Sequence, residues 1–223
     1  IVLMYSFTGS FIYSEIDFSR IPIGLRTPIY MLFLVTIFVK SGIMPFHYWV
    51  VDTYEESDDI FSTVLSAIIS KAGIFLFILI FMKIIGYAYL QSHLFDIVAW
   101  LGVITSIVAT LKAISQDSMK RLLAYSSIAQ VGYIITILAI LIGSALEAGL
   151  YHDVIHTFVK LLLFINIGSI IYITGKNRFS QLGGLLYEYP VLFVLLVIGI
   201  IGLAGMPPLG GFNSKFLIYT TLL

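Results

Sequence analysis

Long apolar runs separated by short polar stretches dominate the pattern along the chain. Runs long enough to cross about 30 Å of hydrocarbon as helices occupy residues 29–50, 60–85, 94–115, 119–143, 147–173 and 190–223. These runs are too long for barrel strands, and helices satisfy their own backbone groups in lipid. The pattern predicts an all-α polytopic transmembrane helix bundle forming a single domain over residues 1–223, with about six complete spans. Residues 1–13 are expected to end a further apolar segment, and Ile1 indicates a fragment or an unusual start codon.

Two of the predicted spans contain helix breakers inside apolar sequence. In the first, Gly42 and Pro45 follow Lys40, and in the last, the stretch 205–211 (GMPPLGG) precedes Lys215. We expect the helical hydrogen bonds to be interrupted at both places. Paired broken spans that each carry a lysine are typical of transporters with repeated halves, in which freed carbonyls hold water or cations. An ordinary proline kink is the alternative.

A line of titratable residues lies in the fifth predicted span. His152, His156 and Lys160 stand at i, i+4 and i+8, so a helix places them on one face. Such groups in hydrocarbon cost several kcal/mol unless water or partners solvate them. We therefore predict that this face lines the bundle interior and relays protons. Snorkelling to the interface and metal binding by the histidine pair are the alternatives.

Other ionisable residues are further candidates for the relay. Lys71 lies about a dozen residues into its span, where burial disfavours the charged form and so suits a proton carrier. Permanent pairing with a carboxylate is the alternative for Lys71. Lys120 and Arg121 open a span close to Asp117, which fits an interfacial ion pair as well as a relay. His47 either relays protons or caps a helix end.

Composition excludes several classes of function. Apolar residues make up 60% of the chain and charged residues 11%, against roughly 25% charged in soluble domains, so we expect an integral membrane protein. The net charge of zero, without a basic block, argues against nucleic acid as a partner. The sequence has no cysteine, which excludes thiolate metal sites and Cys-held iron–sulfur clusters. We predict neither a metal nor a cofactor on this chain.

The basic residues of the connections predict an orientation. Alternating loops place two groups on opposite sides, Lys112, Lys120, Arg121, Lys176 and Arg178 on one and Arg20, Arg26 and Lys83 on the other. The positive-inside rule assigns the first group to the cytoplasm or matrix. The acidic loop 52–59 is expected on that same side.

Several motifs, in order, resemble the antiporter-like proton-pumping subunits of respiratory complex I (NADH dehydrogenase subunits 2, 4 and 5) and the related Mrp-type antiporters. They are residues 40–49 (KSGIMPFHYW), Lys71, residues 116–127 (QDSMKRLLAYSS), the His-x3-His-x3-Lys helix at 152–160, and residues 207–215. The resemblance covers about residues 36–220. Residues 49–55 favour subunit 2, whereas residues 147–151 favour subunit 4 or the Mrp D-type antiporter, so the family member stays open.

The resemblance implies a partial antiporter-like inverted-repeat fold with a water-filled axis of lysines and histidines at mid-membrane. The implied proton relay consists of Lys40 as the gating lysine of one half-channel, Lys71 as the connection, Lys120, His152, His156 and Lys160 in the second half, and Lys215 at the exit. The chain also departs from the family. Val51 and Asp58 replace common prolines, Asp117 stands one position early, and the glutamate partner of Lys40 would lie before Ile1.

The function implied by the resemblance is proton translocation by a membrane subunit of a complex I-like NADH:ubiquinone oxidoreductase, without redox chemistry on this chain. Its implied partners are other membrane subunits, and its implied location is the mitochondrial inner membrane or a prokaryotic cytoplasmic membrane. A stand-alone Mrp-type antiporter exchanging Na+ for H+ is the alternative, because the same relay would serve both. A truncated scaffold is a third reading, which the ionisable positions argue against.

Overall fold

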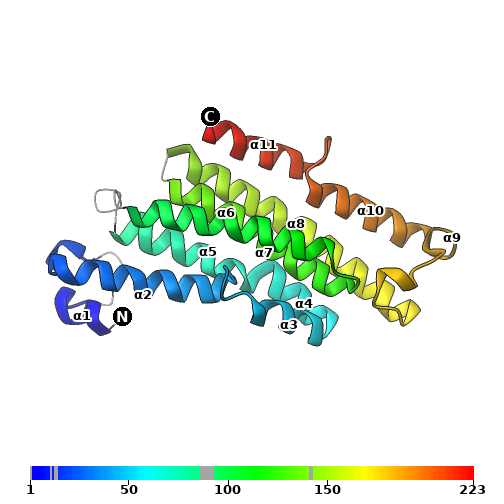
Figure 1. Cartoon of the computed structure of the whole chain (residues 1–223), viewed down its shortest axis with the longest axis horizontal. Coiled ribbons are helices and arrows are strands. Elements are labelled where there is room, and N and C mark those ends of the chain that lie inside the picture. Colours follow the sequence, from blue (N-terminus) through cyan, green and yellow to red (C-terminus); the bar gives the residue numbers. More distant parts are fainter. Residues whose placement is uncertain (1, 11, 13–14, 86–92, 141–142) are drawn as a thin grey trace.

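The computed structural model describes residues 2–10, 12, 15–85, 93–140 and 143–223. Within these ranges the chain is helical and contains no strand. Most helices run along the longest axis of the molecule (Figure 1). Five described helices are long and apolar enough to cross a membrane. The predicted all-α membrane fold is therefore confirmed.

The elements follow one another with short connections. In chain order they are α1 (Val2–Thr8), η2 (Phe18–Arg20), α2 (Ile23–Ser41), α3 (Tyr48–Glu56), α4 (Asp59–Val64), η3 (Leu65–Ile69), α5 (Lys71–Phe77), η4 (Ile78–Ile85), α6 (His93–Ile114), α7 (Met119–Ile140), α8 (Gly143–Thr174), η6 (Phe179–Gln181), α9 (Leu185–Glu188), α10 (Pro190–Ala204) and α11 (Gly210–Leu222). The elements η3 and η4 are π-helical turns that continue the helix of α4 and α5.

Helix α7 is the central helix of the bundle. A larger share of its residues is buried than in any of the other four candidate spans. It packs against α6 through two glycines: a Cβ placed on Gly102 would lie 2.8 Å from the Gly132 carbonyl oxygen, and one on Gly132 would lie 2.7 Å from the Gly102 carbonyl oxygen. Helix α8 covers another side of α7 and also contacts α10 and α11. Residues of α7 can therefore meet those of α8 in the interior.

Both predicted helix breaks are confirmed. Helix α2 ends at Ser41 because Gly42 adopts a left-handed conformation with φ 70°, and α3 begins only at Tyr48. Helix α10 ends at Ala204 before Gly205, whose φ of 80° is also left-handed. Such values of φ favour glycine, which has no Cβ to clash.

The described residues contain five candidate spans, against about six complete spans expected. The last expected span, 190–223, is divided at its break into α10 and α11, of 15 and 13 residues. Each is shorter than the roughly 20 residues that cross the hydrocarbon core. Two expected connections are also helical, because α3 continues to Glu56 and α8 begins at Gly143.

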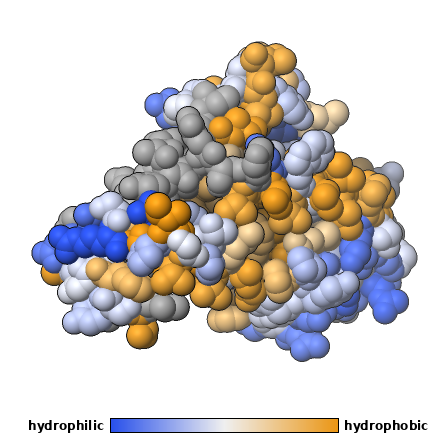
Figure 2. All heavy atoms as spheres, turned by 60° about the vertical axis from the view of Figure 1, so that its left-hand side comes forward, coloured by the Kyte–Doolittle hydropathy of each residue, from blue (hydrophilic) through white to orange (hydrophobic). Residues whose placement is uncertain are grey.

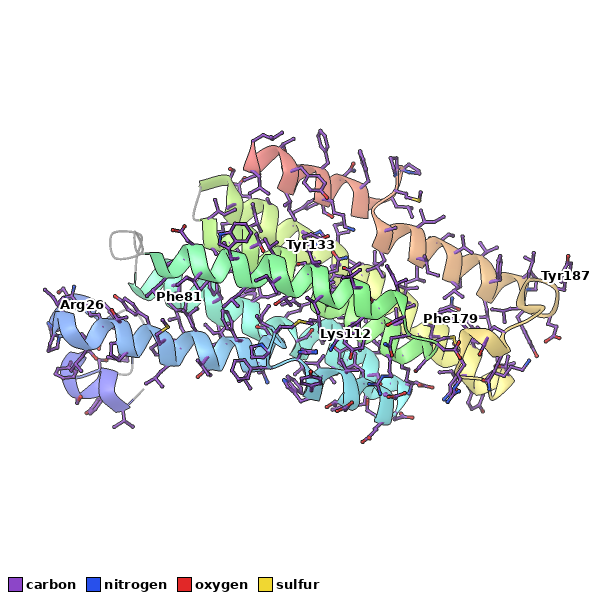
Figure 3. The ribbon with its side chains drawn as sticks, viewed as in Figure 1. Arg26, Phe81, Lys112, Tyr133, Phe179 and Tyr187 are labelled. Atoms are coloured by element: carbon purple, nitrogen blue, oxygen red, sulfur yellow. The ribbon has the colours of Figure 1, made fainter. Side chains whose placement is uncertain are left out.

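The predicted grouping of the loops agrees with the contacts between them. The Met119 backbone N–H donates to the Asn177 carbonyl at 3.1 Å, and Arg121 forms an ion pair with Glu55 at 2.5 Å. The loops before α7 and after α8 therefore share one end of the bundle with the acidic loop. Arg26 lies at the opposite end (Figure 3), and the side chain of Lys83 lies outside the described part of the chain.

The exposed apolar surface fits a lipid-facing belt. In Figure 2 hydrophobic residues cover much of the middle of the visible face, and hydrophilic residues gather toward its edges. Along α6, large apolar side chains such as Ile104, Ile107 and Leu111 are exposed. Their exposure to water would be unfavourable, whereas lipid solvates them.

Candidate proton-relay site

The three residues spaced four apart on α8 all lie on its inward face. His152, His156 and Lys160 are all buried, with exposed fractions of 3%, 3% and 0%. The rings of His152 and His156 are stacked with their centroids 6.3 Å apart. Their side chains do not reach the surface, so the snorkelling alternative does not apply.

Lys71 joins this face from α5. Its Nζ lies 2.7 Å from Nδ1 of His156 and 3.3 Å from Oδ1 of Asp153. Lys71 begins α5, and a single residue separates it from the π-helical turn η3. Relay and permanent pairing are the two alternatives for Lys71. Its Nζ has a contact that suits each of them, His156 as a proton acceptor and Asp153 as a carboxylate partner.

Asp153 was not among the residues predicted from the sequence. It directly follows His152, so helical geometry turns its side chain away from the line of His152 and His156. Only the position of α5 relative to α8 brings Lys71 to Asp153. The one signal in the sequence is an acidic residue inside an apolar span, which by itself indicates an intramembrane ion-pair partner.

Lys160 is held by neutral oxygens of α7. Its Nζ donates to the Leu123 carbonyl at 2.7 Å and to the Ser126 hydroxyl at 2.5 Å. Among the described residues, no carboxylate forms an ion pair with Lys160. It also lies 6.0 Å from the centroid of the Phe164 ring. Lys160 can therefore gain or lose a proton without breaking an ion pair with a carboxylate.

His152 contacts two further helices. Its Nδ1 lies 2.9 Å from the Ser214 hydroxyl of α11, and its Nε2 lies 2.9 Å from Oε1 of Gln130 on α7. With both nitrogens in hydrogen bonds, the pair His152–His156 is arranged for hydrogen bonding more than for metal binding. Gln130 is a second residue that the sequence analysis missed.

A small cavity lies beside His156. It measures about 10 Å³, and its wall is apolar. His152, His156, Gln130, Ser214 and Lys215 are among its lining residues. Nε2 of His156 is buried and has no direct hydrogen-bond partner among the described residues. The cavity thus connects the α8 histidines with the second break.

Lys215 binds the end of α10. Its Nζ donates to the carbonyls of Leu203 and Ala204, at 3.0 Å each. The last carbonyls of a helix have no partner inside the helix and carry partial negative charge, which suits a cation. The break therefore creates the acceptors that hold Lys215, and it keeps the ammonium beside the His156 cavity.

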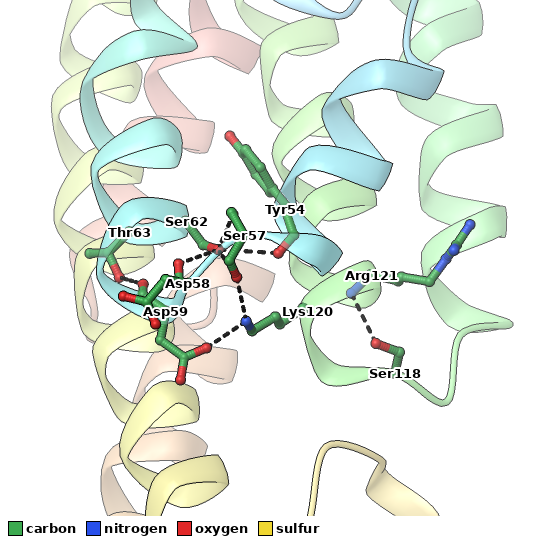
Figure 4. A network of polar contacts seen from close by, with 9 residues as sticks. All are labelled: Tyr54, Ser57, Asp58, Asp59, Ser62, Thr63, Ser118, Lys120 and Arg121. Atoms are coloured by element: carbon green, nitrogen blue, oxygen red, sulfur yellow. Dashed lines mark hydrogen bonds and ion pairs between the residues drawn. The ribbon is translucent and has the colours of Figure 1, made fainter.

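Lys120 lies apart from the central cluster. Its Nζ is 2.5 Å from Oδ1 of Asp59 and 2.9 Å from the Ser57 carbonyl, near the loops (Figure 4). The suggested pairing of Lys120 with Asp117 is wrong. Asp117 precedes the first turn of α7 and accepts hydrogen bonds from the Ser180 backbone N–H and hydroxyl, at 2.9 and 2.7 Å. These bonds hold the pKa of the Asp117 carboxyl below its ordinary value.

Lys40 and His47 flank the first break without reaching the central cluster. Lys40 is half-buried in the last turn of α2. His47 is buried, its side chain makes no helix-capping bond, and its Nε2 lies 3.3 Å from Nζ of Lys112. Lys112 was expected only as a loop charge. It points into the protein, 5.1 Å from the centroid of the Tyr48 ring.

Comparison with known proteins agrees with this geometry. The family model described as "NADH:quinone oxidoreductase/Mrp antiporter, TM" matches residues 1–223. The chain belongs to this family. The chain is 36% identical over 210 residues to NADH-quinone oxidoreductase subunit N of Phocaeicola vulgatus, covering 91% of the chain and 44% of that protein. It is 33% identical over 193 residues to a Na(+)/H(+) antiporter subunit of Alkalihalophilus pseudofirmus, covering 86% and 39%.

Solved structures share the fold. The membrane-bound sulfane sulfur reductase, an archaeal respiratory membrane complex, contains a chain with a TM-score of 0.86 and 34% identity, covering 99% of this chain and 38% of that one. A chain of the Mrp complex from Dietzia sp. DQ12-45-1b has a TM-score of 0.90 at 23% identity, covering 99% and 41%. The chain spans less than half the length of these relatives.

Proposed function

We propose that this chain moves protons across the membrane within a larger membrane assembly. The observation that carries the proposal is the contact of 2.7 Å between Lys71 Nζ and His156 Nδ1 inside a transmembrane bundle. Titratable groups at this depth are expensive, and proton relays are among their main uses. Lys160 and His152, on the same face of α8, extend the relay beyond the first pair.

The two nitrogens of His156 give the relay its chemistry. The Lys71 ammonium donates its proton to Nδ1, and the proton already on Nε2 leaves toward the next group of the relay. Lysine becomes a neutral amine and the imidazole ends as the other tautomer, so no net charge accumulates on His156. His152, whose ring is stacked 6.3 Å from that of His156, is the next titratable group of the relay to take the released proton. General acid–base groups at hydrogen-bond distance are what such a transfer requires.

The assembly we propose is a complex I-like NADH:ubiquinone oxidoreductase, in which other subunits carry the electrons. Similarity to NADH-quinone oxidoreductase subunit N supports this reading. The 223 residues contain no cysteine, so they supply no thiolate ligand for an iron–sulfur cluster. The neighbouring membrane subunits would cover the exposed apolar faces that lipid does not.

A stand-alone Na+/H+ antiporter is the second candidate, favoured by the similarity to the antiporter protein of Alkalihalophilus pseudofirmus. The two functions differ in what drives the proton. In the first, quinone reduction acidifies or alkalinises the vesicle lumen without Na+. In the second, an imposed Na+ gradient does so without an electron donor.

The test uses the full-length protein, purified with its natural neighbours and reconstituted into vesicles with a pH-sensitive dye. Co-purification with iron–sulfur subunits and electron-driven pH change support the redox assembly. Purification without redox subunits, together with a pH change driven by Na+ alone, would overturn it in favour of the antiporter. A preparation in which neither force moves protons would contradict proton transport altogether.

A further inference from the structure

A buried line of serines runs along α4 and η3 toward the relay. Ser62, Ser66 and Ser70 stand four residues apart, with exposed fractions of 0%, 0% and 7%. Ser70 directly precedes Lys71. A four-residue spacing keeps these side chains on one face, and that face points into the bundle. Nothing in the relay described above uses these hydroxyls.

Tyr54 of α3 faces the middle of this line. Its side chain is fully buried, and its hydroxyl lies on the side of Ser66 and Ser70. None of the described residues forms a hydrogen bond of good geometry with that hydroxyl. A buried phenol without a close partner costs stability, so its presence calls for an explanation.

The outer end of the line reaches the ion pair near the loops. The Ser62 and Ser57 hydroxyls are 2.7 Å apart, and the Ser57 carbonyl accepts the hydrogen bond from Lys120. Figure 4 shows these residues gathered around Lys120 and Asp59. A surface groove of about 790 Å³ is lined by Asp58 and Asp59. The outer end is therefore accessible from outside the bundle.

The inner end of the line approaches Lys160. The Ser66 and Ser127 hydroxyls are 3.4 Å apart, and Ser127 donates to the Leu123 carbonyl at 3.0 Å. The same carbonyl accepts from Lys160. Hydroxyls thus lead from the partly exposed Lys120–Asp59 pair to the Leu123 carbonyl that holds Lys160.

We propose that these residues form the proton route between the Lys120 end of the bundle and the central lysines. This hydroxyl line consists of Ser57, Ser62, Tyr54, Ser66, Ser70 and Ser127. The inference rests on the proposed function and adds a route to it. Each hydroxyl accepts a proton on an oxygen lone pair and passes on the proton it already held. Every member therefore ends neutral, and one proton has moved along the line.

The local backbone supports this assignment over a purely structural one. Several of the serines bond to backbone carbonyls, as Ser70 does to Ser66 at 2.8 Å, and this alone would satisfy them. It does not account for the unpaired Tyr54 hydroxyl. The π-helical turn η3 (Leu65–Ile69) also lies at this point, and such turns occur frequently at functional sites.

The test removes single hydroxyls from the full-length protein in its reconstituted assembly. We expect Tyr54→Phe and Ser66→Ala each to slow proton translocation about tenfold, at the low end of what a positioned proton-transfer group contributes. Ser66→Thr, which keeps the hydroxyl, should restore the rate. Two variants away from the hydroxyl line are the matched controls. Tyr30→Phe removes the hydroxyl of a tyrosine that stacks on Phe18, and Ser106→Ala removes a hydroxyl that donates to the Ala129 carbonyl.

Lys160→Ala separates failure of this route from failure of the proposed function. If Lys160→Ala stops translocation while Tyr54→Phe and Ser66→Ala translocate at the rate of the controls, the hydroxyl line is wrong and the relay stands. If Lys160→Ala translocates normally, the relay itself is wrong. Equal losses in the test variants and the controls would mean that the hydroxyls act only in folding, which would also overturn the route.

Discussion

Replacing Gly211 by alanine tests how the second break positions α11. A Cβ on Gly211 would lie 1.9 Å from the Gly202 carbonyl oxygen, whereas ordinary van der Waals contact begins at 3.4 Å. The difference, 3.4 − 1.9 = 1.5 Å, is the distance by which α11 would have to move from α10. The obstacle is backbone, so no side-chain rotation relieves it.

This displacement would reach the relay. Ser214 lies one turn along α11 from Gly211, and its hydroxyl is 2.9 Å from Nδ1 of His152. A shift of comparable size would stretch that contact beyond hydrogen-bond distance. Overpacking of this kind costs about 1–3 kcal/mol. At about 2–4 °C per kcal/mol for a chain of 150–250 residues, that cost lowers the melting temperature by about 2–12 °C.

The assay compares the melting temperature and the proton-translocation rate of the full-length protein before and after substitution. Gly24→Ala is the control, because a Cβ on Gly24 meets nothing within 4 Å. We expect Gly211→Ala to lower both quantities and Gly24→Ala to leave both unchanged. A Gly211→Ala protein as stable and active as the parent would refute the close packing of α10 against α11.

Two other predictions concern single polar contacts. Gln130→Ala leaves Nε2 of His152 without its acceptor, so we expect a loss of about 1–3 kcal/mol, visible as a lower melting temperature, whereas an unchanged value would contradict the contact. The Ser180 hydroxyl and backbone N–H hold the pKa of the Asp117 carboxyl below its ordinary value. Their stabilising effect is therefore present above about pH 4 and is lost as the pH falls through the lowered pKa. Ser180→Ala should reduce the difference in melting temperature between about pH 6 and pH 3, and an unchanged difference would argue against it.

The helical spans and their breaks could be predicted because local chemistry decides them. The left-handed conformations at Gly42 and Gly205 end their helices at the places that the glycines and prolines indicate. The common face of His152, His156 and Lys160 follows from helical periodicity alone. The division of the last span is different, because the number of residues that α10 and α11 retain depends on how each packs against α8.

The partners of the charged residues could not be predicted, because they belong to different helices. No spacing in the sequence indicates that Lys120 forms its ion pair with Asp59 and not with Asp117, which is nearer in sequence. In the same way, the sequence indicates only a charge near a loop at Lys112. In the fold α6 lies beside the first break, and Lys112 contacts His47 there. Tertiary packing, and not sequence distance, selects each of these partners.

Substitution of Lys160 tests the central claim most directly. Its side chain is fully buried and held by the Leu123 carbonyl and the Ser126 hydroxyl. Lys160→Ala removes the titratable group, and Lys160→Arg keeps a charge that does not release its proton at any working pH. The measurement is proton translocation by the reconstituted full-length assembly, with the assembled amount as the control. The account predicts that both variants assemble and that both lose translocation, by about tenfold or more. Full translocation in the arginine variant would show that Lys160 only holds a charge, which would contradict the relay.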